Sequence, residues 1–386
     1  MTALPRRGRN RTLAMLAATV VVALSVPALG YVGVKAVLDS TGGRNALDDN
    51  LEVQSFPNTP SALYLTTDER GVLSSATVFV LAPAGVGGSI ISVPINADVG
   101  LAANTRRSLQ QVFAEGGVDA TVPAIESTLL VSITYSAVAD PEQLVQFLTP
   151  YQPFTVQLPA PVAGDGDGQA ALPAGAAVLQ AANAARVLTA GLAPKQPVDP
   201  QRQGNIDALW SAVVTSIGSG RAPATPIAGG PTTFDELVVH LVAAQTQSRG
   251  LTATALTGSE NPDDVDVVEI DHSEAVLVFA SIAPGSMLAP APGPFIRLEA
   301  PPGYDLQLKL TIDKLLFLKA NVVSVNSTAQ ARPGTVFLVP DEANRQLVQT
   351  TDEIFGDITF GTPTVRIESV DVTIQLGTDY LDGLPT

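Results

Sequence analysis

The residue types of a hydrolase triad occur side by side once in this sequence, as Asp271, His272 and Ser273 within the segment 269–274. Triad residues normally come from distant elements that fix their geometry, so neighbours in sequence rarely act together. The other histidine, His240, is isolated, and two separate histidines do not make a zinc site. The chain has no cysteine, which excludes disulfides, thiolate metal sites and cysteine nucleophiles. We therefore predict no metal site, and expect the segment 269–274 to be a solvated, acidic strand end.

Charge is distributed unevenly along the 386 residues. Five of the 21 basic residues precede residue 39, whereas all 37 acidic residues follow residue 38, so the later part carries 16 − 37 = −21 formal charges. Such a surface repels nucleic acid and anionic lipid headgroups. We therefore exclude nucleic acid as a partner.

The five early basic residues flank an uncharged, apolar run over residues 12–34; they are Arg6, Arg7, Arg9, Arg11 and Lys35. At about 1.5 Å rise per residue, this run spans the roughly 30 Å hydrocarbon core of a bilayer. We predict a cytoplasmic basic tail over residues 1–11 and a single-pass anchor in the cell membrane over residues 12–38. Because basic residues stay on the cytoplasmic side, the remainder is expected to be extracytoplasmic. A cleaved signal peptide is the alternative, since small residues flank Pro27.

The residues beyond a linker over 39–60 are numerous enough for two domains. In the first, over 61–275, β-branched runs at 76–81 and 127–133 alternate with helical patterns at 108–115 and 141–148, and a strand is expected at 154–158. This alternation predicts an α/β sheet sandwiched between helices. Further helices are expected over 176–188, 205–217 and 234–244, with Trp210 packed in the core.

A proline- and alanine-rich stretch, predicted as a linker over 276–294, precedes a smaller α/β domain over 295–383. Strands and helices alternate there as well. We expect strands over 295–300, 321–325 and 369–376, and helices over 306–318 and 341–355.

Several segments, taken in order, resemble one family of bacterial envelope proteins. Residues 63–70 are similar to a first strand and Gly-x-Asp-x-Arg turn with the glycine replaced, and residues 91–94 are similar to a Ser-Ile-Pro segment. Arg202-Gln203 matches a later landmark, and residues 370–380 resemble the last strand of a terminal domain. With the basic tail and anchor, this order resembles the LytR-CpsA-Psr (LCP) family with a LytR-type C-terminal domain, in its actinobacterial arrangement.

The resemblance implies a fold and a function. The fold would be an LCP-like α/β/α domain and a small C-terminal α/β domain behind one membrane helix. Active members of the family transfer a glycopolymer from polyprenyl pyrophosphate to peptidoglycan or another wall acceptor with Mg²⁺, which requires an apolar tunnel for the lipid and charged residues for the phosphates. The phosphate-site residues that the resemblance assigns are Asp68, Arg70, Arg202 and Gln203, with Arg106, Arg107 and Arg186 as possible additions.

The chain departs from the family pattern at most charged positions. An expected acid falls at Ala76, an expected Arg-Asp pair falls at Ile95 and Asn96, and expected arginines fall at Ala190 and Asp199. We therefore interpret the chain as an LCP-like protein of cell-wall assembly whose catalytic site is degenerate and which needs no cofactor. It would act by binding a polyprenyl-linked precursor, a wall polymer or a partner envelope protein. An active, Mg²⁺-dependent phosphotransferase with relocated charges is the alternative. A third possibility is a structural protein with a filled core and no tunnel.

Overall fold

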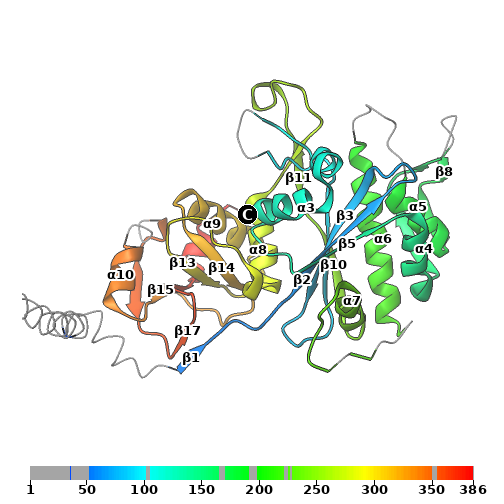
Figure 1. Cartoon of the computed structure of the whole chain (residues 1–386). Helices are drawn as coiled ribbons and strands as arrows, with labels where there is room; N and C mark the ends of the chain where they lie inside the picture. Colours follow the sequence, from blue (N-terminus) through cyan, green and yellow to red (C-terminus); the bar gives the residue numbers. More distant parts are fainter. Residues whose placement is uncertain are drawn as a thin grey trace, which may run out of the picture.

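The computed structural model describes residues 35, 52–100, 105–164, 170–190, 198–220, 225–226, 228–349 and 354–385. A five-stranded mixed sheet in the order β10-β4-β3-β2-β5 forms the centre of the larger unit (Figure 1). Strands β2 and β5 are parallel, as are β4 and β10, and β3 is antiparallel to both of its neighbours. The bounds are β2 Ser61–Thr67, β3 Leu73–Leu81, β4 Gly88–Val93, β5 Tyr135–Ala139 and β10 Thr246–Gly250.

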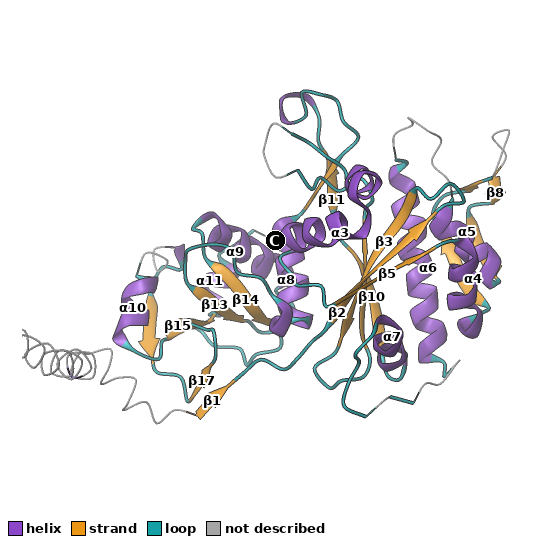
Figure 2. Cartoon of the chain, in the orientation of Figure 1, coloured by secondary structure: helices purple, strands orange, loops and turns teal. Residues whose placement is uncertain are grey.

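Both faces of this sheet are buried, because successive side chains of each strand point to opposite sides. One face carries Tyr64, Phe79 and Ile90 and packs on four helices, whereas the other face carries Leu63, Val78 and Ile91 and packs on two. The helices of the first face are α4 Pro141–Leu148, α5 Ala181–Thr189, α6 Pro200–Gly218 and α7 Phe234–Val242; those of the second are α3 Leu109–Leu129 and α8 His272–Ile282. Figure 2 shows these helix layers around the sheet. The mixed α/β fold predicted from the sequence is confirmed.

Short strands extend the larger unit beyond its sheet. The pairs are antiparallel in each case: β6 with β9, β7 with β8, and β11 with β12. Their bounds are β6 Phe154–Leu158, β7 Val162–Ala163, β8 Ala170–Leu172, β9 Gly175–Leu179, β11 Ala253–Ala255 and β12 Val268–Ile270.

The smaller unit contains a second five-stranded sheet in the order β14-β13-β18-β15-β16. Its buried cluster joins the strands to three helices of the same unit and to one face of α8 through Val276 and Ala280. The bounds are β13 Phe295–Glu299, β14 Asn321–Asn326, β15 Thr335–Leu338, β16 Ile358–Gly361, β18 Val372–Gln375, α9 Asp305–Phe317, α10 Glu342–Val348 and α11 Thr378–Asp382.

Two segments predicted as linkers contain regular structure. Residues 276–282 of the linker predicted over 276–294 are the second half of α8, which buries Phe279 in the larger unit and Ala280 in the smaller one. Within the linker predicted over 39–60, β1 (Glu52–Gln54) pairs in parallel with β17 (Val365–Ile367) of the smaller unit. Neither feature has a local sequence signal, because α8 contributes to two cores and the partner of β1 lies 313 residues further along the chain.

Two secondary-structure expectations were wrong. The strand expected at 127–133 is in part the end of α3, which continues to Leu129 because Thr121, Ile125 and Thr128 bury one helical face. The helix expected over 176–188 is divided at Gln180, where strand β9 ends and α5 begins. In the first case burial at helical spacing outweighs β-branched composition.

The predicted tail and membrane anchor lie outside the described residues, apart from Lys35. Among the helices that the structure does describe, none has the length and apolar character required to cross a bilayer.

Candidate functional site

A cavity of about 360 Å³ lies where the end of β4 meets the first turn of α6. Five positions that the sequence analysis assigned from the family resemblance line this cavity together: Ile95, Asn96, Asp199, Arg202 and Gln203. We call this cavity the α6 pocket. Positions more than 100 residues apart in the chain therefore converge on one site.

Local sequence explains both edges of the α6 pocket. Pro94 follows the last residue of β4, and a proline cannot donate to the strand ladder. Helix α6 begins with Asp199 as its N-cap, whose side chain accepts a hydrogen bond from the Gln201 N–H at 2.9 Å, and Pro200 occupies the first turn. The strand end and the helix start are thus both fixed at the pocket.

The turn after β2 holds Asp68 and Arg70 against each other. The Asp68 Oδ1 atom accepts the backbone N–H groups of Arg70 and Val72, each at 2.9 Å. Its Oδ2 atom accepts two donors of the Arg70 guanidinium, Nε at 2.9 Å and Nη2 at 2.7 Å. Only 7% of Asp68 is exposed, so this bidentate pair is partly desolvated. Both oxygens of the carboxylate are therefore occupied by the chain itself.

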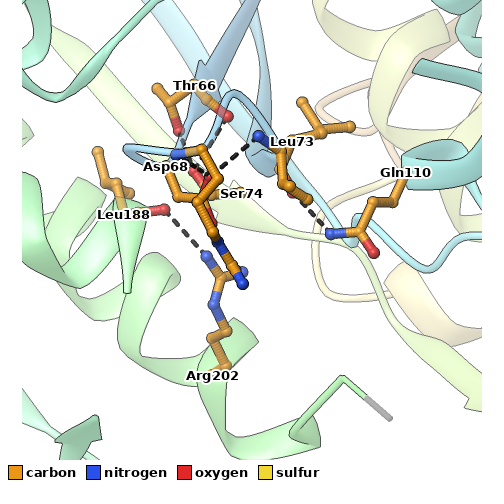
Figure 3. Close-up of polar contacts among 9 residues, drawn as sticks. Thr66, Asp68, Leu73, Ser74, Gln110, Leu188 and Arg202 are labelled. Carbon is orange, nitrogen blue, oxygen red and sulfur yellow. Dashed lines mark hydrogen bonds and ion pairs between the residues drawn. The ribbon is translucent and has the colours of Figure 1, made fainter. Parts of the chain in front are cut away.

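Arg202 is the buried cation of the α6 pocket. Its Nη2 donates to the Leu188 carbonyl at 3.0 Å, as Figure 3 shows, whereas its Nε is buried without a hydrogen-bond partner among the described residues. Burial lowers the pKa of the Arg202 guanidinium to about 10, although the nearby charges of Asp199 and Asp68 oppose that decrease. Arg202 thus keeps one donor that no group of the described chain satisfies.

Asp207, one helical turn beyond Gln203, does not line the α6 pocket but binds the lining residue Gln203. Its Oδ1 accepts hydrogen bonds from the Gln203 Nε2 at 3.0 Å and from the Ser92 hydroxyl on β4. Burial raises the pKa of Asp207, and the hydrogen bonds from Ser92 and Gln203 oppose that increase. Gly250 on β10 lies so close that an added Cβ would stand 2.4 Å from Asp207 Oδ2. The sequence analysis missed Asp207, although residues four apart on a helix are neighbours and Gln203 lies four residues before it.

The remaining arginines named from the sequence do not line the α6 pocket. Arg106 pairs with Asp98 and donates to the Glu260 carbonyl, Arg107 pairs with Glu115, and Arg186 is exposed on α5. Ala76, where an acid was expected, is fully buried in the sheet, and Ala190 packs beside the core of the four-helix face. No relocated arginine therefore replaces the missing ones among the described residues of this pocket.

Carboxylates of the chain accept hydrogen bonds from several N–H groups at the pocket that a phosphate would otherwise accept. Asp199 takes the free N–H of the α6 N-terminus, which otherwise favours anions. Asp266 accepts from the Asn96 Nδ2 at 3.3 Å and from the Val198 N–H. Arg70 donates to Asp68 and Gln203 donates to Asp207, so these donors are satisfied within the chain, whereas Arg202 Nε is not.

The residues present do not fit a magnesium ion. Mg²⁺ is usually held by one or two carboxylates together with phosphates. Asp68 is committed to Arg70 and to two backbone donors, and the second expected acid is Ala76. Across the described ranges, His, Asp and Glu side chains form no group of three or more with a geometry suited to a metal.

The triad-like segment 269–274 serves the fold. Asp271 caps α8 by accepting the Glu274 N–H at 3.0 Å and the Ser273 hydroxyl at 2.7 Å, and it pairs with Lys309 of α9. His272 is the first residue of α8. The expected solvated strand end is present, because β12 ends at Ile270 and both Glu269 and His272 are exposed; Asp271 in addition caps α8 and contacts the smaller unit.

Aromatic rings fill the layer between the sheet and the helices of its four-helix face. Phe79 contacts four rings with centroid separations of 5.6–6.3 Å, and Tyr64 contacts Phe147 and Phe234 at 5.0 and 5.2 Å. Trp210 is part of this layer and is buried, as expected. We call these five residues the ring layer. Rings at such separations leave no space between them for a lipid chain.

Similar folds occur in solved structures of bacterial proteins. No protein-family model matches the chain, and no curated protein matches it. TagV of B. subtilis is 17% identical with a TM-score of 0.42 over 57% of this chain and 94% of TagV. TagT bound to LIIa-WTA is 16% identical with a TM-score of 0.43 over 57% of this chain and 88% of its own. YwtF (TagT), described as a LytR-CPS2A-psr family protein with bound octaprenyl pyrophosphate lipid, is 16% identical with a TM-score of 0.40 over 56% of this chain and 86% of its own.

Proposed function

We propose that this chain is an LCP-like protein of cell-envelope polymer assembly that binds the glycan part of a precursor or wall polymer without transferring phosphate. It acts outside the cytoplasm, held at the membrane by the anchor over residues 12–38. The smaller unit is its LytR-type C-terminal domain. The order of matching segments in the sequence supports the family, and the α6 pocket supports the loss of phosphate chemistry.

One observation carries the proposal: carboxylates of the chain already accept the hydrogen bonds of Asn96, Gln203 and the α6 N-terminus, which leaves Arg202 as the lining cation. Phosphoryl transfer depends almost entirely on positioning and on cations that stabilise the charge of the transition state. The pocket is lined by a single arginine, Arg202, and an acid, Asp199, stands where the family pattern has another arginine. Loss of one such donor reduces turnover by roughly 10²–10³-fold in well-studied cases. The replacement of several removes transfer altogether.

The ring layer supports a role that does not depend on a lipid tunnel. The cavity volume of about 360 Å³ is near the lower end of the about 300–1,000 Å³ typical of small-molecule sites. Such a volume suits a head group or a sugar unit, and the layer between the sheet and the four helices is filled by Phe79, Trp210 and their neighbours. Recognition of the polar part of a precursor is therefore favoured over capture of its tail.

A transfer assay on the full chain in detergent tests the proposal. The protein is incubated with Mg²⁺, a glycan linked to polyprenyl pyrophosphate, and peptidoglycan; transfer would attach the glycosyl phosphate to the acceptor and release polyprenyl monophosphate. We expect no polyprenyl monophosphate, and we expect the glycan to be retained by immobilised protein. An arginine-complete relative handled in parallel is the positive control.

Either of two results would contradict the proposal. Release of polyprenyl monophosphate above the level of a protein-free blank would establish the phosphotransferase alternative. Absence of both turnover and glycan retention would favour the third reading, a structural protein.

A further inference from the structure

We infer that the α6 pocket recognises an uncharged, hydroxyl-bearing sugar unit and rejects pyrophosphate. This inference rests on the proposed function and names the ligand class of the same site. It follows from the inventory of donors and acceptors at the pocket, the balance of charge around it, and one unpartnered buried donor.

Acceptors outnumber free donors at the pocket. The side-chain N–H groups of Asn96 and Gln203 already donate to Asp266 and Asp207. Their side-chain oxygens take no hydrogen bond from the part of the chain that the structure describes, and neither does the Thr252 hydroxyl, which also lines the pocket. A ligand that supplies O–H donors satisfies such a lining, whereas a phosphate, which only accepts when ionised, does not.

The charge balance excludes a polyanion. Arg202 and Asp199 are the charged residues that line the pocket. Beside the lining, Asp266 accepts from Asn96, Asp207 accepts from Gln203, and Asp68 pairs with Arg70. A pyrophosphate would therefore meet one buried cation, one lining carboxylate of its own sign and further carboxylates beside it, and an uncharged ligand avoids this repulsion.

Arg202, which lines the pocket, has a buried Nε donor without a partner among the described residues. An unsatisfied buried N–H is costly, by about 1–3 kcal/mol, so a ligand oxygen that reaches it gains from pairing. A sugar hydroxyl accepts from Arg202 Nε and donates to a neighbouring carboxylate or amide oxygen at the same time. The pocket thus matches a group that both donates and accepts hydrogen bonds. The positive charge of Arg202 is balanced by the nearby carboxylates of Asp199 and Asp68.

Isothermal titration calorimetry on the full chain in detergent tests this inference. The probes are three neutral disaccharides, namely those of N-acetylglucosamine, galactose and arabinose, and inorganic pyrophosphate as the anion. We expect heat of binding with at least one disaccharide and none with pyrophosphate. Trp210, the only tryptophan of the chain, lies on α6 two turns beyond Gln203, so its fluorescence gives a second readout.

Variants assign the binding to this pocket. Gln203→Leu removes a lining acceptor and is expected to weaken disaccharide binding about tenfold, which corresponds to one lost hydrogen bond. Thr252→Val changes the lining without altering α6 and should weaken binding in the same direction. Gln201→Leu, on the same helix but outside the pocket, is the matched control and should leave binding unchanged.

Three results would overturn the inference. Pyrophosphate binding tighter than that of every disaccharide would mean that the phosphate site survives, which leaves the proposed precursor binding intact. Equal loss of affinity in Gln201→Leu and Gln203→Leu would place binding elsewhere. Absence of binding heat with every disaccharide would also refute the inference. The transfer and retention assay would then test the proposed function independently.

Discussion

The α6 pocket and the ring layer share helix α6, which supplies Arg202 and Gln203 to the pocket and Trp210 to the ring layer, yet they are stabilised differently. In the ring layer, Phe79 and Trp210 pack edge to face with centroids 5.6 Å apart, and burial of apolar area dominates. In the α6 pocket, Asp199 and Asp207 hold donors of the chain in charge-assisted hydrogen bonds. The difference is between a core that depends on shape and a site whose polar groups satisfy one another.

Two positions of the pocket that depart from the family pattern have structural roles in this chain. Ile95 belongs to the buried cluster on the two-helix face and is only 2% exposed, so its side chain contributes to packing. Asp199 is the N-cap of α6. Under the proposed function, the fold is kept because the residues at these positions stabilise it.

The largest expected effect lies in the ring layer. Phe79→Ala removes a fully buried ring that contacts Tyr64, Phe147, Phe234 and Trp210. We expect the free energy of unfolding to fall by about 3–5 kcal/mol, measured by urea denaturation, because the cavity cannot be filled by neighbouring rings. Phe317→Ala, at a ring that is 83% exposed, is the matched control and should change stability little. A loss below 1 kcal/mol at Phe79 would mean that the layer is loosely packed and has room for a ligand.

The second effect tests the boundary between the two regions. Gly250→Ala would place a Cβ 2.4 Å from Asp207 Oδ2, so α6 or the carboxylate must move. We expect a loss of about 1–3 kcal/mol in the free energy of unfolding, again from urea denaturation. Gly204→Ala is the control on α6, because its Cβ would meet only Pro159 Cγ at 3.4 Å, an ordinary contact. That variant should be neutral or more stable by up to about 1 kcal/mol. Equal effects of the two variants would refute a rigid contact between Gly250 and Asp207.

The third effect separates the cap from the charge at the pocket. Asp199→Ala removes the N-cap of α6 and should lower the free energy of unfolding by about 1 kcal/mol, whereas Asp199→Asn retains a capping oxygen. Both variants remove the negative charge near Arg202, so both should bind inorganic pyrophosphate more tightly than the parent chain does, as measured by calorimetry. Unchanged pyrophosphate binding in both variants would show that Asp199 does not exclude anions.

Local signals predicted the elements best. Helix α4 has the predicted bounds Pro141–Leu148, because Asp140 and Gln143 form a capping box and Pro141 opens the first turn. Strand β6 at Phe154–Leu158 was predicted equally well from its alternation, which the burial pattern confirms. The end of α3 was missed because the burial of Ile125 and Leu129 against distant elements decides it.

The site was predicted only where the family resemblance reached. Ile95, Asn96, Asp199, Arg202 and Gln203 meet at one cavity, whereas Asp68 and Arg70 do not line it. The partners that compensate their donors were not predicted, because the contacts join residues far apart in the chain. Ser92 and Asp207 are 115 residues apart, and Asn96 and Asp266 are 170 apart. Such pairs are set by sheet order and helix packing, which a single sequence does not display.

The smallest effect concerns Asp207 and depends on pH. Because burial raises the pKa of Asp207 in the folded chain, the folded state binds the proton more tightly than the unfolded state does. The resulting stabilisation is complete below the ordinary pKa of 3.8 and is lost as pH rises through the raised folded value.

Asp207→Asn keeps an oxygen that accepts from Ser92 and Gln203 but does not titrate. We therefore expect the parent chain to lose stability relative to Asp207→Asn as pH increases across this window, in urea denaturation series at matched ionic strength. Asp119→Asn, at an exposed carboxylate of α3, is the control and should show no such trend. If the parent chain instead gains stability relative to Asp207→Asn as pH rises, the hydrogen bonds of the ionised carboxylate stabilise the folded state more than its burial destabilises it. The polar groups of the site would then require the charge of Asp207, just as the ring layer requires close packing.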